Sequence, residues 1–390
     1  MPFQQKGDYS ELLVNWSNNN VYNIMNKYNV LIIAGILVLV CTSCITSVKP
    51  EPNTPFFAKG LKHTLGPNPA LVPGDLGSWD DRVLESGDCF KDGDTYYWFY
   101  HAHSSWDKVS YQIGVATSSS PLGPWKKSEG NPILKVSEKS HETYCVACPM
   151  VVKDGDKYYM IYLSAGDSPV GWGWSVSLAS ADHPLGPWTK SDKNPILVHQ
   201  HMGYPGGLVK VKDKWYMFGT EPSEVHPDYG RMYVATADIL EGPWEVREEP
   251  ALSEGPRGSW DEGTFSEFEV QYFNGLFHAF YGGSQFPEIK DSTDRKEARK
   301  KRLRVREGIG YAYSEDGYNF TKYEGNPVVP YQEVPNCAAM AEVHFLIEYP
   351  RIYCYHTLRY LESPDEENEA WFEQSWVEHL GTQVLEDKLE

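Results

Sequence analysis

Carboxylate side chains recur at three matching places along this chain, each a short distance before a run of aromatic residues. Asp88, Glu267 and Glu342 occupy these places; His344 follows Glu342 by two residues, and His201 stands near the corresponding point of another segment. Two carboxyl groups on either side of a bond can act as general acid and as base or nucleophile. Imidazole groups titrate near neutral pH and can assist. These five residues are the candidate catalytic set.

The environment predicted for these acids supports a functional role. They fall where a buried strand would favour Val or Ile, and a buried carboxylate without a partner is costly. Repeated acids at such positions therefore predict a polar funnel where the strands converge. Surface ion pairs are the alternative, and they apply most to the neighbouring acids Glu85 and Glu269. A register slip of one residue would also exchange the two faces of a strand.

Three further residues are candidates for substrate binding. Trp172 lies with Trp174 between glycines, where indole rings could stack on a sugar or, equally, pack in a core. His101 follows an aromatic run and adds a titratable group. Arg302 belongs to a basic segment, residues 286–306, in a chain that is otherwise acidic. That segment is either a solvated surface loop or a loop that attracts an acidic or sulfated substrate.

A short repeated phrase organises the segments that carry these residues. Asparagine or glutamate, then proline, then two small or aliphatic residues recur at intervals of 55 to 77 residues. Self-similarity at this period, with strand-like segments, is typical of a β-propeller. The five copies are Asn68-Pro69-Ala70-Leu71, Asn131-Pro132-Ile133-Leu134, Asn194-Pro195-Ile196-Leu197, Glu249-Pro250-Ala251-Leu252 and Asn326-Pro327-Val328-Val329.

Tight turns between apolar and aromatic runs supply the strands. Asp92-Gly93, Asp154-Gly155 and Asn274-Gly275 are strong β-hairpin signals, because these residues tolerate positive φ. We therefore predict an all-β chain with one five-bladed propeller over residues 61–365, the basic segment being an insert in its fourth unit. The first copy of the phrase is expected to help close the ring against the last unit. Residues 366–390 are predicted to be an acidic C-terminal segment.

Composition limits the partners and cofactors. The formal net charge of −19 argues against a nucleic-acid partner. The pair Cys145 and Cys148 has no second pair beside it, so zinc is not predicted, and buried strand thiols are the simpler interpretation. No motif for another metal or a cofactor is recognised. The 13 Trp and 26 Tyr suit both strands and sugar-stacking surfaces.

The N-terminal region has the pattern of an export signal. The apolar stretch Val30–Val40 is too short to span a bilayer and is followed by Ser43-Cys44, which resembles a bacterial lipoprotein cleavage site. This predicts a signal over residues 25–44, starting at Met25 and ending at a lipidated Cys44, then a tether over residues 45–60. Residues 1–24 would precede the true start and have no function. A retained membrane-anchoring helix is the alternative. In either case the folded part is expected to be exported and tethered to a membrane, and the lipoprotein pattern predicts a lipid anchor in the bacterial outer membrane.

The Asp-Gly-x-x-Tyr-Tyr hairpins and the Gly-Pro-Trp turns of the repeats resemble those of five-bladed β-propeller glycosidases, including glycoside hydrolase families 43 and 117. The resemblance covers about residues 66–360. For family 43 it implies an Asp base, a helper Asp and a Glu acid on successive blades. Here the first acid is displaced to Asp88, Cys148-Pro149 replaces the helper Asp with its proline, and no acid lies near Pro205. Family 117 is described as using a histidine acid, which directs attention to His201 and His344.

The combined prediction is an exported enzyme that acts on anionic, uronate-bearing or sulfated, oligosaccharides by carboxylate acid–base hydrolysis. Departure from the family 43 trio leaves a second class open. A lyase or dehydratase could eliminate from a uronic acid at the non-reducing end of an algal, ulvan-like oligosaccharide. A third possibility is a glycan-binding surface lipoprotein without catalysis.

Overall fold

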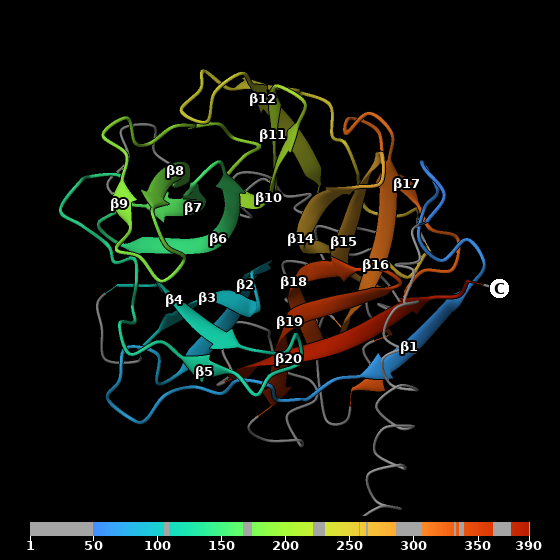
Figure 1. The fold of residues 1–390 in the computed structure, drawn as a ribbon, viewed down its shortest axis with the longest axis horizontal. Helices are drawn as coiled ribbons and strands as arrows, with labels where there is room; N and C mark the ends of the chain where they lie inside the picture. The colour runs from blue at the N-terminus through green and yellow to red at the C-terminus, as the bar shows by residue number, and fades with distance from the viewer. Residues whose placement is uncertain are drawn as a thin grey trace, which may run out of the picture. The chain divides into compact units, whose positions relative to one another are not determined.

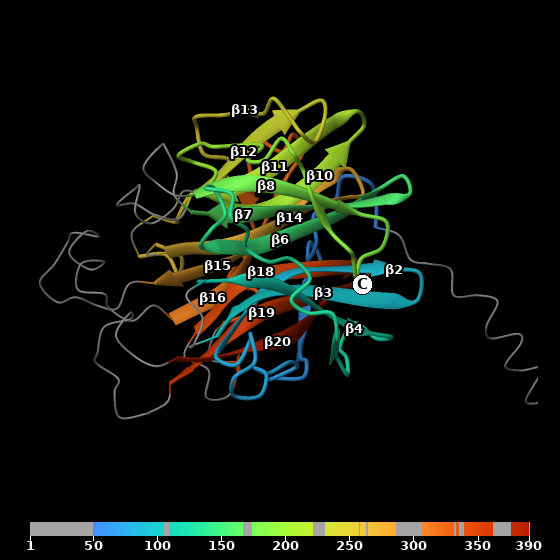
Figure 2. The same ribbon diagram turned by 90° about the vertical axis from the view of Figure 1, so that its left-hand side faces the viewer.

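Five four-stranded antiparallel sheets are arranged around a central axis (Figure 1). The computed structural model describes residues 50–104, 109–166, 174–220, 231–256, 258–262, 264–285, 306–330, 333–334, 339–361 and 376–389. Seen from the side in Figure 2, the long strands of neighbouring blades run alongside one another. The predicted five-bladed β-propeller is therefore confirmed.

Each blade begins with its innermost strand and proceeds outward, and the innermost strands of neighbouring blades contact one another around the ring. The first blade holds β2 (Val83–Asp92), β3 (Thr95–His103), β4 (Gln112–Ser118) and β5 (Lys126–Lys127). The second holds β6 (Cys145–Asp154), β7 (Lys157–Ala165), β8 (Trp174–Ala181) and β9 (Thr189–Lys190). The third holds β10 (Tyr204–Val211), β11 (Lys214–Thr220), β12 (Met232–Ala237) and β13 (Glu245–Val246).

The last two blades differ in how they are completed. The fourth holds β14 (Thr264–Phe273), β15 (Leu276–Gln285), β16 (Arg306–Ser314) and β17 (Thr321–Lys322). The fifth holds β18 (Ala339–Glu348), β19 (Arg351–Leu361) and β20 (Trp376–Asp387), and β1 (Leu61–Leu65) from the other end of the chain is its outermost strand.

The predicted hairpin turns connect the first and second strands of three blades. Gly93, Gly155 and Gly275 have φ values of 59°, 63° and 92°, a conformation that glycine adopts without steric cost. The flanking residues pair across each turn, as Asp92 does with Thr95. The three predicted hairpin turns are therefore confirmed.

The asparagine of the repeated phrase bonds to the third strand of the blade in the first, second and fourth blades. Asn131 accepts a hydrogen bond from the Val115 N–H at 3.0 Å, and its amide donates to the Val115 carbonyl and to the Tyr100 hydroxyl, both at 3.0 Å. Leu134 then forms a bridge with Ile113 on β4. The same side-chain bonds recur at Asn194 and Asn326. The phrase is therefore a structural element of the blades.

The first copy of the phrase closes the ring, as predicted. β1 pairs antiparallel with β20 from Leu61 opposite Asp387 to Leu65 opposite Gln383. Leu71, the last residue of that copy, bridges to Leu380 on β20. Pairing the two ends of the chain in one blade leaves no open seam in the ring.

Two predicted boundaries need correction. The propeller does not end at residue 365, because β20 extends it to Asp387 and its Leu380 and Leu385 are fully buried. Residues 50–60 are not a free tether either. Phe56 and Phe57 are each 1 % exposed and pack in the core beside the fourth and fifth blades, where the Phe56 N–H donates to the Tyr311 hydroxyl at 3.0 Å. Residues 366–390 are rich in acids and residues 45–60 in proline, a composition typical of segments outside a core, so the sequence did not indicate their burial.

Apolar side chains fill the spaces between blades, which we call seams. Trp98 of β3, for example, packs edge-on against Tyr355 of β19 with ring centroids 4.9 Å apart. Four cysteines (Cys89, Cys145, Cys148 and Cys354) are buried free thiols, in line with the sequence interpretation. The strands account for the regular structure of the described ranges, and no helix there has the length and apolarity to cross a bilayer.

Candidate active site

Every innermost strand is interrupted by a β-bulge near its start. Register shifts fall between residues 86 and 89, 147 and 150, 205 and 207, 265 and 268, and 341 and 344. Bulges bend a strand and redirect its side chains, and they are common beside active sites. The candidate acids of the sequence lie at or next to these bulges.

Four charged residues meet at the seam between the first and fifth blades, and we call them the arginine cluster. Arg359 on β19 is the centre: its Nη2 lies 2.9 Å from Glu342 Oε1 and 3.8 Å from Glu85 Oε1, and its Nε lies 2.7 Å from Glu378 Oε1. The side chains keep some access to solvent, at 14 % for Glu85, 11 % for Arg359, 9 % for Glu378 and 5 % for Glu342. Three carboxylates thus share one guanidinium in a nearly dry setting.

Glu85 is held in its ionised form. Burial alone would raise the pKa of this carboxyl, but a hydrogen bond and charge from His101, the charge of Arg359 and the Tyr111 hydroxyl together lower the pKa to about 2. The His101 Nε2 lies 2.8 Å from Glu85 Oε2, and the imidazole is 2 % exposed. His101, predicted to bind substrate, therefore supports Glu85 from β3.

Glu378 has the opposite tendency. Burial raises the pKa of its carboxyl to about 7, and the negative charge of the adjacent Glu85 adds to the effect although Arg359 opposes it. A hydrogen bond joins Glu378 to Glu85, so the two carboxyls share one proton near neutral pH. Two neighbouring carboxyls with pKa values displaced in opposite directions are a pattern from which acid and base roles can be assigned.

Glu342 reaches the cluster because of the bulge in β18. Its φ of 51° is unusual for a residue with a side chain, and it is 4 % exposed. The Thr357 hydroxyl donates a hydrogen bond to Glu342 Oε2 and accepts one from the Ser86 N–H at 2.9 Å. Glu342 is thus fixed by Arg359 on one oxygen and Thr357 on the other.

Asp88 belongs to a second acidic group, which we call the axial pair. Asp88 on β2 accepts a hydrogen bond from the Val151 N–H of β6 at 2.7 Å, and Glu269 on β14 accepts one from the Phe345 N–H of β18 at 2.9 Å. Burial raises the pKa of Asp88 to about 7; burial and then the charge of Asp88 raise the pKa of Glu269 well above its usual range. Both acids therefore connect adjacent inner strands, and neither joins the arginine cluster.

The two predicted histidines lie in different surroundings. His344 is 3 % exposed, its Nδ1 lies 3.0 Å from the Glu342 carbonyl, and burial lowers its pKa to about 3. It is neutral at physiological pH and acts as a donor that holds the bulge. His201 stacks on Tyr233 of the third blade, with ring centroids 4.2 Å apart, and its Nε2 lies 3.4 Å from Glu248 Oε2. The described bonds of the arginine cluster join residues of the first and fifth blades, so His201 of the third blade is not among those partners.

Four predicted residues lie outside what the structure describes. The backbone of Glu267 is in β14 at its bulge, but its side chain is not described. Trp172, Arg302 and Cys44 fall outside the described ranges altogether, as does most of the basic insert.

Sequence reasoning missed Arg359 and Glu378. They are directly opposite each other on β19 and β20. The available signal was the set of β-branched and apolar residues between residues 376 and 385, which favours a strand that could pair with the preceding one.

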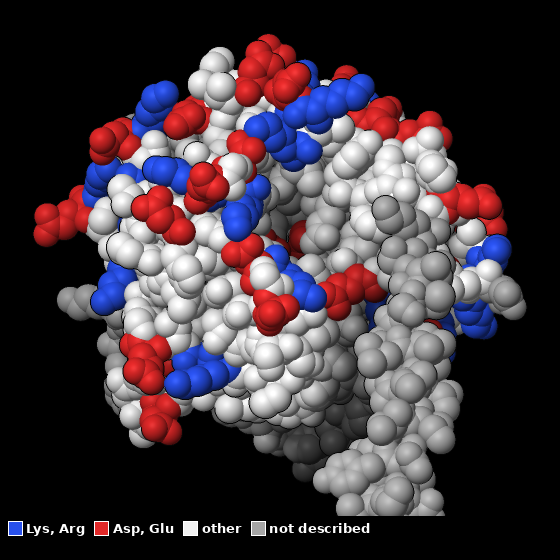
Figure 3. Space-filling view, in the orientation of Figure 1, with Lys and Arg blue, Asp and Glu red and all other residues white. Residues whose placement is uncertain are grey.

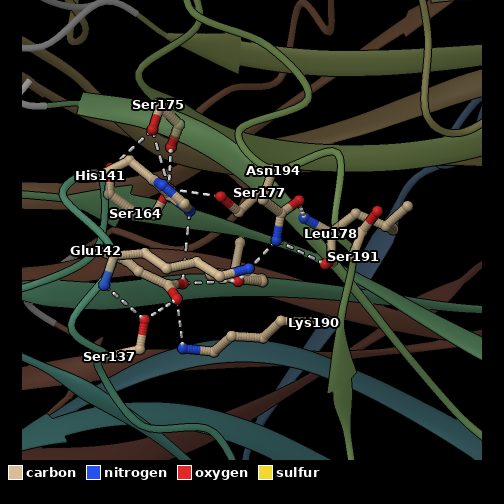
Figure 4. A network of polar contacts seen from close by, with 12 residues as sticks. Ser137, His141, Glu142, Ser164, Ser175, Ser177, Leu178, Lys190, Ser191 and Asn194 are labelled. Carbon is tan, nitrogen blue, oxygen red and sulfur yellow. Dashed lines mark hydrogen bonds and ion pairs between the residues drawn. The ribbon is translucent and has the colours of Figure 1, made fainter. Parts of the chain in front are cut away.

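A different set of acids proves to be structural. Glu142 accepts a hydrogen bond from the Tyr162 hydroxyl and pairs with Lys190, both at 3.0 Å, and Ser137 also donates to it (Figure 4). Asp80 meets Tyr100 and Lys127 in the first blade, and Asp261 meets Tyr281 and Lys322 in the fourth. The Trp-Asp pairs at residues 79–80 and 260–261 thus help to hold the start of a blade.

At the hairpin end of the inner strands, opposite the end that holds the arginine cluster, lysines pair with acidic side chains. Hairpin ends of neighbouring blades are linked by the pairs Lys91–Glu348, Lys153–Asp92 and Lys210–Asp154, each at 2.8 Å. On the face seen in Figure 3, basic and acidic side chains lie side by side to the left of and below the central hollow, and the described surface immediately to its right is uncharged. Within the described ranges, no group of three or more His, Cys, Asp and Glu side chains is arranged to hold a metal ion.

Solved structures with a similar fold agree with this architecture, although the sequence comparisons find no relative. No family model matches the sequence, and no curated protein is detectably similar to it. Among solved structures, a thermostable family 43 glycoside hydrolase has 16 % identity, covers 82 % of this chain and 96 % of its own, and gives a TM-score of 0.51. A family 117 glycoside hydrolase from Zobellia galactanivorans has 17 % identity, coverage of 84 % and 91 %, and a TM-score of 0.52.

A third similar structure belongs to the GH130 family, described as mannoside phosphorylases together with hydrolases of β-1,2-mannosidic linkages in Candida mannan. It has 14 % identity, covers 87 % of this chain and 96 % of its own, and gives a TM-score of 0.59. At these identities the likeness is one of fold, and it is the fold that the sequence resemblance implied.

Proposed function

We propose that the protein is a glycosidase-like enzyme whose acid–base centre is the arginine cluster. One observation carries the proposal: three carboxylates, those of Glu342, Glu378 and Glu85, surround the Arg359 guanidinium at 2.9, 2.7 and 3.8 Å. Burial raises the pKa of Glu378, and the neighbouring His101 and Arg359 lower that of Glu85, which separates an acid from a base. The fold likeness to glycoside hydrolases supports the reaction class.

In this proposal the Glu85–Glu378 pair is the acid. Glu378 donates its proton to the oxygen of the leaving sugar, and the bond between that oxygen and the anomeric carbon breaks. Glu342 accepts a proton from the attacking water, which adds to the anomeric carbon. Arg359 holds the Oε1 atom of both Glu342 and Glu378 in place. His101 keeps Glu85 ionised. The nearby negative charge favours the positive charge that develops on the sugar ring.

Hydrolysis fits the charges better than elimination. Elimination from a uronic acid needs cations free to neutralise the substrate carboxylate. In the arginine cluster Arg359 is already bound to Glu342 and Glu378. A uronate placed there would add a fourth carboxylate around one guanidinium, so the sugar at the scissile bond is proposed to be uncharged.

We propose that the substrate is nevertheless anionic elsewhere along its length. The motive is the basic segment 286–306, with Arg299, Lys300, Lys301 and Arg302 in sequence.

Export and lipid attachment at Cys44 are also proposed, on the pattern of Val30–Val40 followed by Ser43-Cys44. Intact-mass measurement of the membrane-extracted protein should show a lipidated N-terminus at Cys44. Cys44→Ala should release the protein from the membrane fraction. Recovery of a soluble wild-type form that begins at Met1 would contradict the proposal.

Mass spectrometry of products tests the reaction class. The purified protein is incubated with neutral, uronate-bearing and sulfated oligosaccharides; hydrolysis adds one water across the products, whereas elimination yields an ultraviolet-absorbing unsaturated uronate. Glu342→Gln and Glu378→Gln should each lower turnover about a hundredfold or more. Glu248→Gln, at a side chain 67 % exposed beside His201, is the matched control. Binding without any product would instead support a glycan-binding protein.

A further inference from the structure

Two aromatic rings meet at the seam between the second and third blades. Trp174 is the first residue of β8 and Tyr204 the first residue of β10. Their ring centroids are 5.3 Å apart with the planes inclined by 33°. Both residues are only partly buried, whereas the core aromatics Trp98 and Tyr162 are fully buried.

These rings lie at the same end of the strands as the arginine cluster. Tyr204 opens an innermost strand immediately before its bulge, as Glu85 and Glu342 stand at the bulges of theirs. The inner strands follow one another around the ring in blade order. The seam between the second and third blades is therefore across the axis from the seam between the fifth and first, which holds the arginine cluster.

Tyr111 connects the two sides. Its hydroxyl is hydrogen-bonded to the Glu85 carboxylate, and its ring packs against the group formed by Cys145 and Cys148, on which Trp174 and Tyr204 also pack. This group carries no charged side chain, and Cys148 stands at the bulge where the fifth blade has Glu342. The described group on this side of the funnel is thus aromatic and uncharged, whereas the arginine cluster that it faces is acidic.

From this division we infer that Trp174 and Tyr204 form a subsite for the apolar C–H face of an uncharged pyranose ring. Partly exposed Trp and Tyr rings offer a flat apolar surface with a polar edge, which suits a sugar that has one apolar face and hydroxyls around it. Bound there, a substrate extends from the aromatic side toward the carboxylates. Only this last point, which places the reacting bond, rests on the proposed function.

The alternative is that the two rings only pack the seam. In that case their removal changes stability but not sugar binding. The experiment therefore needs a binding measurement separate from turnover, and a control ring that is exposed but lies away from the seam. Tyr272, 39 % exposed near the hairpin end of β14, provides it.

The test measures binding of the full-length protein, carrying Glu342→Gln to suppress cleavage, to an array of arabinan, xylan, mannan, galactan and agarose. Trp174→Ala and Tyr204→Ala in this background should weaken binding at least about tenfold. Tyr204→Phe, which keeps the ring, and Tyr272→Ala should bind like their parent. Thermal unfolding confirms that each variant is folded, and a variant that is not folded is replaced by Trp174→Leu or Tyr204→Leu, which fills the seam without a flat ring and should also weaken binding.

Two results would overturn the inference: unchanged binding by folded Trp174→Ala and Tyr204→Ala, or a parent that binds none of the five polysaccharides. Failure of the proposed function gives a different result. If the wild-type protein cleaves nothing but the array signal disappears with Trp174→Ala, the subsite stands and the hydrolytic proposal falls. If cleavage occurs and the KM is unaffected by Trp174→Ala, the hydrolytic proposal stands and the subsite falls.

Discussion

Replacing Glu378 by glutamine should change how the stability of the protein depends on pH. Burial, with the charge of Glu85, raises the pKa of this carboxyl from 4.5 to about 7 in the folded protein. The folded state therefore binds the proton more tightly than the unfolded state does. The stabilisation from this group is complete below pH 4.5 and is lost as pH rises to about 7.

The expected size follows from the displacement of the pKa. One pKa unit corresponds to about 1.36 kcal/mol, so Glu378 should account for a fall of about 3 kcal/mol in the free energy of unfolding across this interval. Glutamine keeps the size of the side chain but cannot titrate. The variant should therefore lack this part of the fall, while the raised pKa of Asp88 and of Glu269 affects both proteins alike and cancels in their difference.

Urea unfolding of wild type and Glu378→Gln at several pH values between about 4 and 8 measures this difference. It should change by about 3 kcal/mol from one end of the range to the other. Glu129→Gln, at a side chain that is 90 % exposed and pairs with Lys126, should show a constant difference from wild type. A constant difference for Glu378→Gln as well would refute the reasoning, because it would mean that Glu378 titrates normally in the folded protein.

The pH dependence of turnover provides a second test of the role of Glu378. If Glu378 is the proton donor, wild-type turnover should decline as pH exceeds about 7, where the carboxyl loses its proton. Glu378→Gln should be about a hundredfold slower and should show no such decline. A variant with the wild-type pH profile would assign the donor role to another residue.

Four further outcomes are expected. Glu85→Gln should reduce the loss of stability as pH falls from 4.5 to about 2, because the lowered pKa of Glu85 contributes to that loss together with other carboxyls such as Asp92; acid unfolding curves measure it. Asn131→Ala should cost about 2–3 kcal/mol in urea unfolding by leaving buried partners unpaired, whereas Glu249→Ala, the exposed equivalent in the third blade, should cost less than about 0.5 kcal/mol. Phe57→Ala should cost about 3–5 kcal/mol, and a near-neutral effect would restore the tether interpretation. Neutralising residues 299–302 should weaken binding of a sulfated oligosaccharide at low salt and have less effect at physiological ionic strength, where the screening length is about 8 Å.

The placement of the site shows where sequence reasoning reached its limit. Glu342 was a candidate because the hairpin turns set the register of its strand, and the structure places it in the arginine cluster. Asp88 was a candidate on the same grounds, yet it bonds to Val151 and joins the axial pair. The two acids have equivalent signals in the sequence. The bulges and the neighbouring blade decide which group each joins.

What the sequence determined by itself is the repeated unit: five blades, the Gly-containing hairpins of three of them, and the proline phrase of each, which carries asparagine in four copies and Glu249 in the remaining one. These features depend on φ preferences and on contacts within one blade, for example between Asn131 and Val115, so they leave a regular local pattern. Only the tertiary structure decided that Phe57 is core, that β20 completes the fifth blade, and that Arg359 gathers three glutamates. Those facts depend on residues hundreds of positions apart meeting where the ring closes, and the burial that displaces the pKa values of Glu85 and Glu378 exists only once it has closed.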